Sequence, residues 1–413
     1  MPEIDAGNTA WLLMSTALVM FMLPGLSLFY GGLVRRKNVL STIMHSFFGL
    51  ALVTIVWVIV GFSLAFAPSM NLPILGTGII GGFDFAMFNG VGMEASTVYA
   101  TTVPFVLFAG FQLMFAAITP ALITGAFAER KRFASFVTFT VLWSLFIYSP
   151  LAHWVWSPDG WLFKLGALDY AGGTVVHISS GVSALVAALM IGKRHKNGEK
   201  MDPHDVPMTV LGAGILWFGW FGFNAGSAVA ADGRASMALM VTTVAAAAGM
   251  ISWVGVQYMR TKKVSAVGAA AGAVAGLVAV TPASGFVGVG GALIIGLVVG
   301  GLSYTMAALL RERLQVDDAL DVFAVHGVGG MWGALATGIF AVAAIGGVGG
   351  LIEGNPQQLI NQLIAVVATV AFAAAGTAVI MLIINALFGA RVSEEHEEIG
   401  LDLAVHGEAA YQA

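Results

Sequence analysis

The chain has 413 residues, of which 58% are hydrophobic and 10% are charged, with a net charge of −4 and no cysteine. Soluble domains have about 25% charged residues, so this composition excludes an ordinary soluble protein and indicates an integral membrane protein. The lack of cysteine excludes disulfides, iron–sulfur clusters and thiol catalysis. Because no polar block interrupts the apolar sequence, we expect one membrane domain over residues 1–389 and a polar, acidic tail over 390–413.

Eleven apolar runs follow one another along the chain, each near the roughly 20 residues that a helix needs to cross a bilayer. The first follows a stretch without Lys or Arg, unlike the basic start of a secretory signal peptide, so we interpret it as a true span. Segment 68–99 is expected to be an external loop or a short interfacial helix. The predicted fold is an all-α integral membrane protein with 11 transmembrane helices at 9–33, 40–67, 100–128, 134–156, 170–192, 207–230, 236–259, 265–281, 286–310, 319–344 and 358–389. Many glycines offer close helix contacts, for example Gly222 and Gly226.

The basic residues alternate between the loops that join these runs. Of the 18 Lys and Arg residues, all except Lys164 and Arg234 follow an odd-numbered run. Short cytoplasmic loops hold the Lys and Arg of membrane proteins. The pattern therefore predicts a multi-pass protein with the N-terminus outside and the C-terminus in the cytoplasm. We expect it in the cell (plasma) inner membrane.

Four histidines lie inside the apolar runs; His45 and His153 are nearer the ends of theirs, whereas two others each follow shortly after an acidic residue. Asp169 precedes His177 in the fifth run, and Asp321 precedes His326 in the tenth. Ionisable groups within a membrane are costly and are candidates for function. A lone membrane histidine can also be a satisfied structural hydrogen-bonding group, whereas a pair favours a central polar site.

The order of the runs allows a five-plus-five inverted repeat, because the first and sixth would cross in opposite directions. The repeats would cover about 9–192 and 207–344, and 358–389 would be an extra helix. The two histidines would then occupy equivalent positions and meet near the midplane. An enzyme of the membrane interior could also use such a pair, so symmetry by itself does not establish transport.

Six sequence blocks add a resemblance to this pattern. They are DYAGGTVVH at 169–177, GWFGFNAGS at 219–227, TPA at 281–283, VDD at 316–318 with DVFAVHG at 321–327, FQLMF at 111–115 with GAFAER at 125–130, and GLD at 400–402 with HGE at 406–408. In this order, across about 9–410, the chain resembles the ammonium transporter, methylamine permease and Rhesus protein family, and most closely its prokaryotic ammonium transporters.

The resemblance implies eleven helices with an inverted pseudo-two-fold, one pore per subunit of a homotrimer, and ammonium or ammonia as substrate, with methylammonium as an analogue. It also implies a soluble PII-type regulatory partner at the cytoplasmic pore mouth, where the loop 193–204 and the tail lie. The roles that it implies are external recruitment of the cation for Trp156, Phe111 and Ser227, a gate for Phe115 and Phe223, a pore for His177 and His326, and structural support for Asp169.

The chemistry of these residue types suits the implied roles. Aromatic faces attract a cation, and the Ser227 hydroxyl can accept an N–H bond. Paired phenylalanine rings would exclude water and hydrated ions. Other readings stay open at this stage: Trp156 as part of an interfacial aromatic belt, the phenylalanines as packing, and Asp169 as an N-cap rather than a cation ligand.

We therefore expect recruitment of ammonium outside, loss of a proton near the gate, passage of ammonia past the histidines and reprotonation inside. The alternatives are a Rhesus-like neutral channel for ammonia or carbon dioxide, and an ammonium sensor, for which the tail 390–413 is too short to form a soluble signalling domain. The sequence has no phosphate-binding loop, zinc motif, nucleophile elbow or basic nucleic-acid patch. We expect no enzymatic activity, no cofactor, no metal and no nucleic-acid partner.

Overall fold

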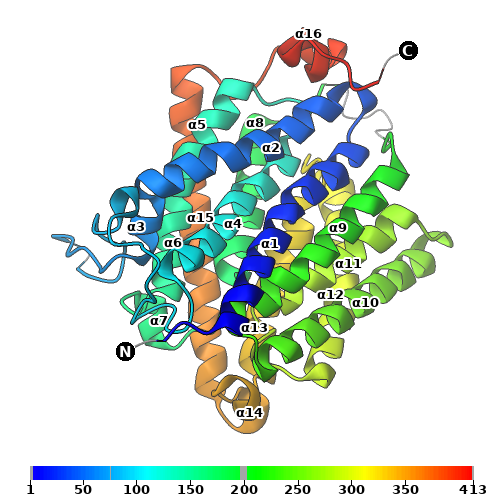
Figure 1. Ribbon diagram of the computed structural model, residues 1–413. Helices are drawn as coiled ribbons and strands as arrows, with labels where there is room; N and C mark the ends of the chain where they lie inside the picture. The colour runs from blue at the N-terminus through cyan, green and yellow to red at the C-terminus, as the bar shows by residue number, and fades with distance from the viewer. Residues whose placement is uncertain (1–2, 75, 196–201, 412–413) are drawn as a thin grey trace.

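The computed structural model describes residues 3–74, 76–195 and 202–411, and over these ranges the protein is a bundle of helices (Figure 1). Ten of the described helices are long and apolar enough to cross a membrane, and extended segments there pair only as isolated bridges. The predicted all-α membrane fold is confirmed. The remaining predicted segment is α11 (Ala266–Val280), a shorter apolar helix. Its 15 residues rise only about 22 Å against a core about 30 Å thick, so a count of eleven crossings stays a prediction.

Most helices are regular, but several contain wider π-helical turns. Trp57–Gly61 joins α2 to α3, Ser144–Tyr148 joins α5 to α6, and the π turns Gly173–Ile178 and Phe323–Gly327 precede α8 and α13. The remaining bounds are α1 (Ala6–Leu33), α2 (Val39–Val56), α3 (Phe62–Phe66), α4 (Phe105–Ile123), α5 (Phe133–Trp143), α6 (Ser149–Trp156), α7 (Trp161–Leu165), α8 (Ser179–Ile191), α9 (Val206–Ala225), α10 (Gly233–Thr261), α12 (Val289–Leu309), α13 (Val328–Phe340), α14 (Ala343–Gly346), α15 (Pro356–Leu387) and α16 (Glu394–Ile399).

Local sequence explains where several helices begin. The helix expected over 100–128 starts only at Phe105, because a residue before a proline such as Pro104 avoids helical backbone angles. The helix expected over 170–192 starts at Gly173, since Gly172 has a φ of +117°, which suits a glycine and not a helix. The tenth helix is likewise shorter than the expected 319–344 and spans Phe323–Phe340.

Segment 68–99 is a loop, and its longest helical piece in the described residues 68–74 and 76–99 is the 3₁₀ turn Ala86–Phe88. It is tied to the ends of α3 and α6. Ser69 Oγ lies 2.7 Å from His153 Nε2, the Trp154 indole donates to the Ile79 carbonyl at 2.7 Å, and the Tyr99 hydroxyl donates to the Phe66 carbonyl at 2.6 Å. The loop prediction is confirmed.

Glycines let α1 and α9 pack closely. A Cβ added at Gly222 would lie 2.6 Å from Leu18 Cβ, and one at Gly226 would lie 2.5 Å from Ser15 Cβ. Contacts this short do not occur between real side chains, so only glycine fits at these two positions. The predicted role of both glycines in helix packing is confirmed.

The two termini lie at opposite ends of the bundle, with the N-terminus beside α7 and the C-terminal α16 at the far end (Figure 1). Loops rich in arginine meet at the end with α16. Glu129 accepts from Arg35 and Arg194, and Arg391 pairs with Glu397 of α16. We call this the basic end.

Candidate functional site

A cavity of about 230 Å³ brings together the three residues expected to recruit a cation, Trp156, Phe111 and Ser227. We call it the tryptophan cavity. Ser227 Oγ donates to the Phe223 carbonyl at 2.8 Å, which leaves the hydroxyl lone pairs available to a ligand N–H. Gln112 also lines this cavity, and its buried Oε1 has no hydrogen-bond partner among the described residues. This second acceptor could not be predicted from the sequence, because an isolated Gln has no distinctive motif.

Two phenylalanine rings close the inner end of the tryptophan cavity. The rings of Phe115 and Phe223 have centroids 4.3 Å apart, and each residue is 1% exposed. Phe115 lines the tryptophan cavity and meets the Trp156 ring edge-on at 6.0 Å. Phe223 lies on the inner side, where its ring stacks at 5.9 Å on the imidazole of His177. The residues expected to form a gate are therefore in contact, between the tryptophan cavity and the histidines.

The two histidines face each other inside the bundle. His177 Nδ1 and His326 Nδ1 are 3.2 Å apart, and both residues are buried. Both line a narrow apolar void of about 10 Å³, which we call the histidine cavity. His177 Nε2 has no hydrogen-bond partner among the described residues, so it is free to bind a small polar molecule. Because two like nitrogens share one hydrogen bond, one must carry the proton and the other must accept it.

Trp220 fixes the orientation of this pair and was not recognised from the sequence. Its ring stacks on His177 at 5.5 Å with an interplanar angle of 19°. Its indole donates to Thr281 Oγ1 at 2.9 Å. Trp220 and Thr281 both lie inside sequence blocks that carry the family resemblance. Membership of these blocks was the signal that could have identified them.

Glycines allow the histidine-bearing segments to cross. A Cβ at Gly181 would lie 2.1 Å from the Gly327 nitrogen, next to His326 in the chain. A Cβ at Gly330 would lie 3.0 Å from the Gly173 carbonyl oxygen. The segments that carry His177 and His326 therefore touch backbone to backbone, and this contact brings the imidazoles within hydrogen-bonding distance.

Asp169 anchors the start of the His177 segment. Its carboxylate accepts from the N–H groups of Gly172, Gly173 and Thr174 at 2.6–2.8 Å, and also from the Thr174 hydroxyl. Burial raises the pKa of Asp169, and these hydrogen bonds oppose the rise. The Asp169 carbonyl accepts from the Trp156 indole at 3.0 Å. The carboxylate is thus bonded to its own turn, and Asp169 does not line the tryptophan cavity.

The matching anchor of the His326 segment is Asp318 and not Asp321, the acidic residue nearer to this histidine in the sequence. Phe323 N–H donates to Asp318 Oδ2 at 2.7 Å. Asp318 precedes His326 by eight residues, the same spacing that separates Asp169 from His177. This shared spacing was the available signal.

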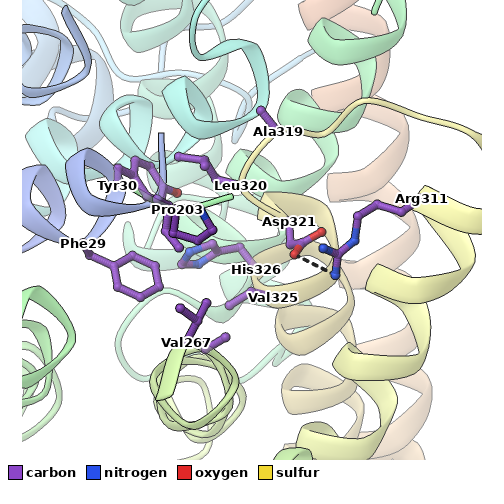
Figure 2. A pocket seen from close by; sticks show the side chains of 12 residues that line it. Phe29, Tyr30, Pro203, Val267, Arg311, Ala319, Leu320, Asp321, Val325 and His326 are labelled. Atoms are coloured by element: carbon purple, nitrogen blue, oxygen red, sulfur yellow. Dashed lines mark ion pairs between the residues drawn. The ribbon is translucent and has the colours of Figure 1, made fainter. Parts of the chain in front are cut away.

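Asp321 instead belongs to a third cavity, of about 140 Å³, shown in Figure 2. We call it the arginine cavity. His326 lines it as well as the histidine cavity, so the two spaces adjoin at this imidazole. Asp321 Oδ2 lies 3.3 Å from a guanidinium nitrogen of Arg311. Burial raises the pKa of Asp321, while Arg311 and Arg194 act in the opposite direction.

The described residues contain no group of three or more His, Cys, Asp or Glu side chains placed to hold a metal ion. The site is instead a row of three cavities. The phenylalanine pair lies between the tryptophan and histidine cavities, and His326 lies between the histidine and arginine cavities. Such a row can admit a cation at an aromatic end and pass a small molecule through an apolar middle.

Comparisons with known proteins agree with one another. A family model described as Ammonium Transporter Family matches residues 10–411. The chain is 48% identical to the "Ammonium transporter" of Bacillus subtilis over 99% of both chains, and 47% identical to "Ammonium transporter Amt1" of Archaeoglobus fulgidus over 98% and 99%. Among solved structures, Saccharomyces cerevisiae Mep2 matches with a TM-score of 0.86 and 39% identity over 95% of this chain and 91% of that one. A structure titled "Sensor Amt Protein" matches with a TM-score of 0.88 and 31% identity over 97% and 98%. The chain belongs to the ammonium transporter family.

Proposed function

We propose that this protein is a transporter, not an enzyme, and that it moves ammonium by separating it into ammonia and a proton. Ammonium is recruited in the tryptophan cavity, loses a proton near Phe115 and Phe223, crosses the histidine cavity as ammonia and is reprotonated in the arginine cavity. The observation that carries this proposal is the order of the three cavities, with the narrowest and most apolar in the middle.

Electrostatics favours a proton loss before the phenylalanine pair. In the tryptophan cavity a cation can contact the faces of Trp156 and Phe111, worth about 0.5–2 kcal/mol each, and can donate to Ser227 and Gln112. Beyond the rings, a charge in the membrane interior costs at least about 2.5–3.5 kcal/mol on the lowest scale. The histidine cavity offers ring nitrogens and apolar walls but no carboxylate among its described lining residues. Neutral ammonia therefore meets a lower barrier than ammonium.

The histidine pair suits ammonia because it presents both hydrogen-bonding roles. With one proton shared between the two Nδ1 atoms, one Nε2 accepts and the other donates. Ammonia can donate to the first and accept from the second. A potassium ion can neither donate nor accept a hydrogen bond, so the same histidine pair contributes to selectivity for ammonia over potassium.

Currents from purified protein in liposomes on a solid-supported membrane test this proposal. We expect an ammonium-dependent current in the wild type and no potassium current. In His177→Ala we expect ammonium selectivity to change while the protein still folds. Transport of ammonia without any ammonium-dependent current would instead favour the Rhesus-like neutral channel, and unchanged selectivity in His177→Ala would remove the pair from the mechanism.

We propose that the tryptophan cavity faces outside and the basic end faces the cytoplasm of a cell inner membrane. The distribution of Lys and Arg supports this orientation, as do the termini at opposite ends (Figure 1). The natural sequence has no cysteine, so Glu3→Cys and Glu408→Cys each add a single thiol. In intact cells we expect a membrane-impermeant maleimide to label Glu3→Cys alone; labelling of Glu408→Cys alone would reverse the orientation.

The assembly state and the regulatory partner are also proposals. We propose a homotrimer, with a soluble PII-type protein binding at the basic end. The tail is folded onto this end, because Asp402 accepts from the N–H groups of Leu40 and Ser41 at 3.1 and 2.8 Å. Lys196 and Lys200 of the expected docking loop lie outside the described residues. Mass measurement of the detergent-solubilised protein tests the trimer, and pull-down with a cognate PII protein with and without nucleotides tests the partner.

An ammonium sensor is a second candidate, favoured by the match to the structure titled "Sensor Amt Protein". The identity to that chain is 31%, lower than the 47–48% to relatives named ammonium transporters. Binding of ammonium without any sustained transport by the purified protein would favour this second candidate.

A further inference from the structure

The arginine cavity holds a carboxylate and a guanidinium that face each other beyond the histidines (Figure 2). Arg311 and Asp321 are paired at 3.3 Å, and they come from different parts of the fold, Arg311 from the π turn at the end of α12 and Asp321 from the turn before α13. Any molecule that leaves the histidine cavity past His326 enters the space that these two side chains line. The mechanism proposed above does not use either of them.

The backbone holds Asp321 in a strained conformation. Its φ is +57°, in the left-handed region that non-glycine residues rarely adopt. Its N–H donates to the Asp318 carbonyl at 3.2 Å, and its own carbonyl accepts from Val325 at 3.0 Å. Strain of this kind persists where the surrounding structure requires a defined side-chain position. Here the Asp321 carboxylate points toward Arg311 (Figure 2), and both side chains line the arginine cavity.

The two partners differ in their freedom to move. The Asp321 side chain is 24% exposed, whereas that of Arg311 is 60% exposed. An exposed ion pair is weak, about 0.2–1 kcal/mol, because water screens it and the long side chain loses entropy. The guanidinium can therefore leave the carboxylate and return to it at little cost.

A fixed carboxylate at the exit has two opposite effects on a newly formed ammonium ion. It stabilises the cation, which favours reprotonation of ammonia on this side. It also retains the cation and lets ammonium from the same compartment bind back. A nearby cation that competes for the carboxylate would relieve the second effect without removing the first.

We propose that Asp321 is a cation site for the leaving ammonium and that Arg311 is a tethered competitor that promotes its release. This inference rests on the proposed transport function. Arg311 returns to Asp321 as ammonium departs and keeps the carboxylate occupied between cycles. Asp321 binds the transported ion, and Arg311 acts through Asp321.

The test measures inhibition by ammonium on the basic side in liposomes whose protein orientation has been selected by the single-cysteine labelling described above. External ammonium drives the current, and internal ammonium is raised stepwise. In Arg311→Gln the carboxylate loses its competitor, so we expect half-inhibition at a lower internal ammonium concentration than in the wild type. An ion pair of about 0.2–1 kcal/mol corresponds to a decrease of about 1.4- to fivefold.

Arg313→Gln is the matched control. It removes the same charge from the same turn, is exposed, and does not line the cavity. We expect the internal ammonium concentration that halves its current to equal that of the wild type. Comparison with this control corrects for the fall in driving force as internal ammonium rises. Asp321→Asn keeps a residue that tolerates the left-handed backbone. We expect it to weaken internal inhibition and to abolish the effect of Arg311→Gln in the double variant.

Equal inhibition in Arg311→Gln and Arg313→Gln would overturn the proposal, as would an effect of Arg311→Gln that persists when Asp321 is Asn. If Arg311→Gln fails to fold, Asp321→Asn compared with the wild type decides alone, and unchanged inhibition overturns the site. An absence of ammonium current in the wild type would count against the proposed function, a result distinct from all of these.

Discussion

The contact between Gly181 and Gly327 makes a sharp prediction about the histidine pair. In Gly181→Ala the added Cβ would lie 2.1 Å from the Gly327 nitrogen and 2.4 Å from its Cα. Both obstructing atoms belong to the backbone, so no side chain can rotate away. Ordinary contacts begin at 3.4 Å, and the two segments must therefore separate by about 1.3 Å.

This separation exceeds what the imidazole pair can absorb. The Nδ1 atoms of His177 and His326 are 3.2 Å apart, and a hydrogen bond much beyond 3.5 Å is lost. Overpacking of a dense interior costs about 1–3 kcal/mol, and loss of the buried hydrogen bond adds about 1–3 kcal/mol. We expect Gly181→Ala to lose about 2–6 kcal/mol of stability and most of its ammonium current.

Gly214→Ala is the control, because a Cβ at Gly214 has no atom within 4 Å. It should be neutral or slightly stabilising, since Ala is a better helix former than Gly by up to about 1 kcal/mol. Thermal unfolding of both variants in detergent, and their ammonium currents in liposomes, would be compared with the wild type. If Gly181→Ala matched Gly214→Ala in both measurements, the reasoning from close backbone contact would be refuted.

Three further predictions follow from the same structure. In Asp169→Asn, an amide nitrogen would face the Thr174 N–H and the Thr174 hydroxyl, so we expect a loss of about 2–4 kcal/mol in unfolding free energy, and unchanged unfolding would contradict the anchoring role. In Phe223→Ala, the ring between the tryptophan and histidine cavities is lost, and we expect the ratio of ammonium to potassium current to fall, whereas an unchanged ratio would show that Phe115 closes the path alone. Burial and Arg130 lower the pKa of Lys131 to about 7, and its Nζ lies 4.5 and 4.9 Å from the centroids of the Phe127 and Phe139 rings. Because the unfolded chain binds the lysine proton up to about pH 10.4, the free energy of unfolding of the wild type should rise from about pH 7 to 10. The lowered pKa of Lys131 alone would give a rise of about 4–5 kcal/mol, and the cation–π contacts reduce this rise to about 2 kcal/mol. Lys131→Met should lose the rise when thermal unfolding is measured across this pH range.

Apolar runs and loop charges were sufficient to predict the helical membrane fold and the place of most helices. They failed at helix starts, where single residues decide: Pro104 delays α4, and the left-handed Gly172 delays the segment with His177. Hydropathy reports how apolar a segment is, but the backbone angles of one residue set its first hydrogen bond. Boundaries of this kind are accessible only from local turn chemistry.

Recognition of the candidate site from sequence depended on residue rarity. A histidine in an apolar run shortly after an acidic residue is unusual, so His177 and His326 were identified in the fifth and tenth runs. Phe115 and Phe223 are two of 27 phenylalanines and were assigned only through the family blocks. Gln112, Trp220 and Arg311 were missed because their roles depend on what they face across the bundle. No periodicity in the sequence encodes such a partner.

The Nδ1-to-Nδ1 contact of the two histidines restricts where their protons can lie. Two like nitrogens at 3.2 Å can bond only if their rings hold opposite tautomers, so one proton has two possible places. The two places are unequal, because His177 stacks against Trp220 and Phe223 while His326 lines the arginine cavity. In the proposed mechanism, a proton on His177 Nδ1 would make the His177 Nε2 an acceptor for ammonia and the His326 Nε2 a donor. Moving that proton to His326 would exchange the two roles, so under the proposed mechanism the pair could hold ammonia in either direction of travel without taking up a net charge.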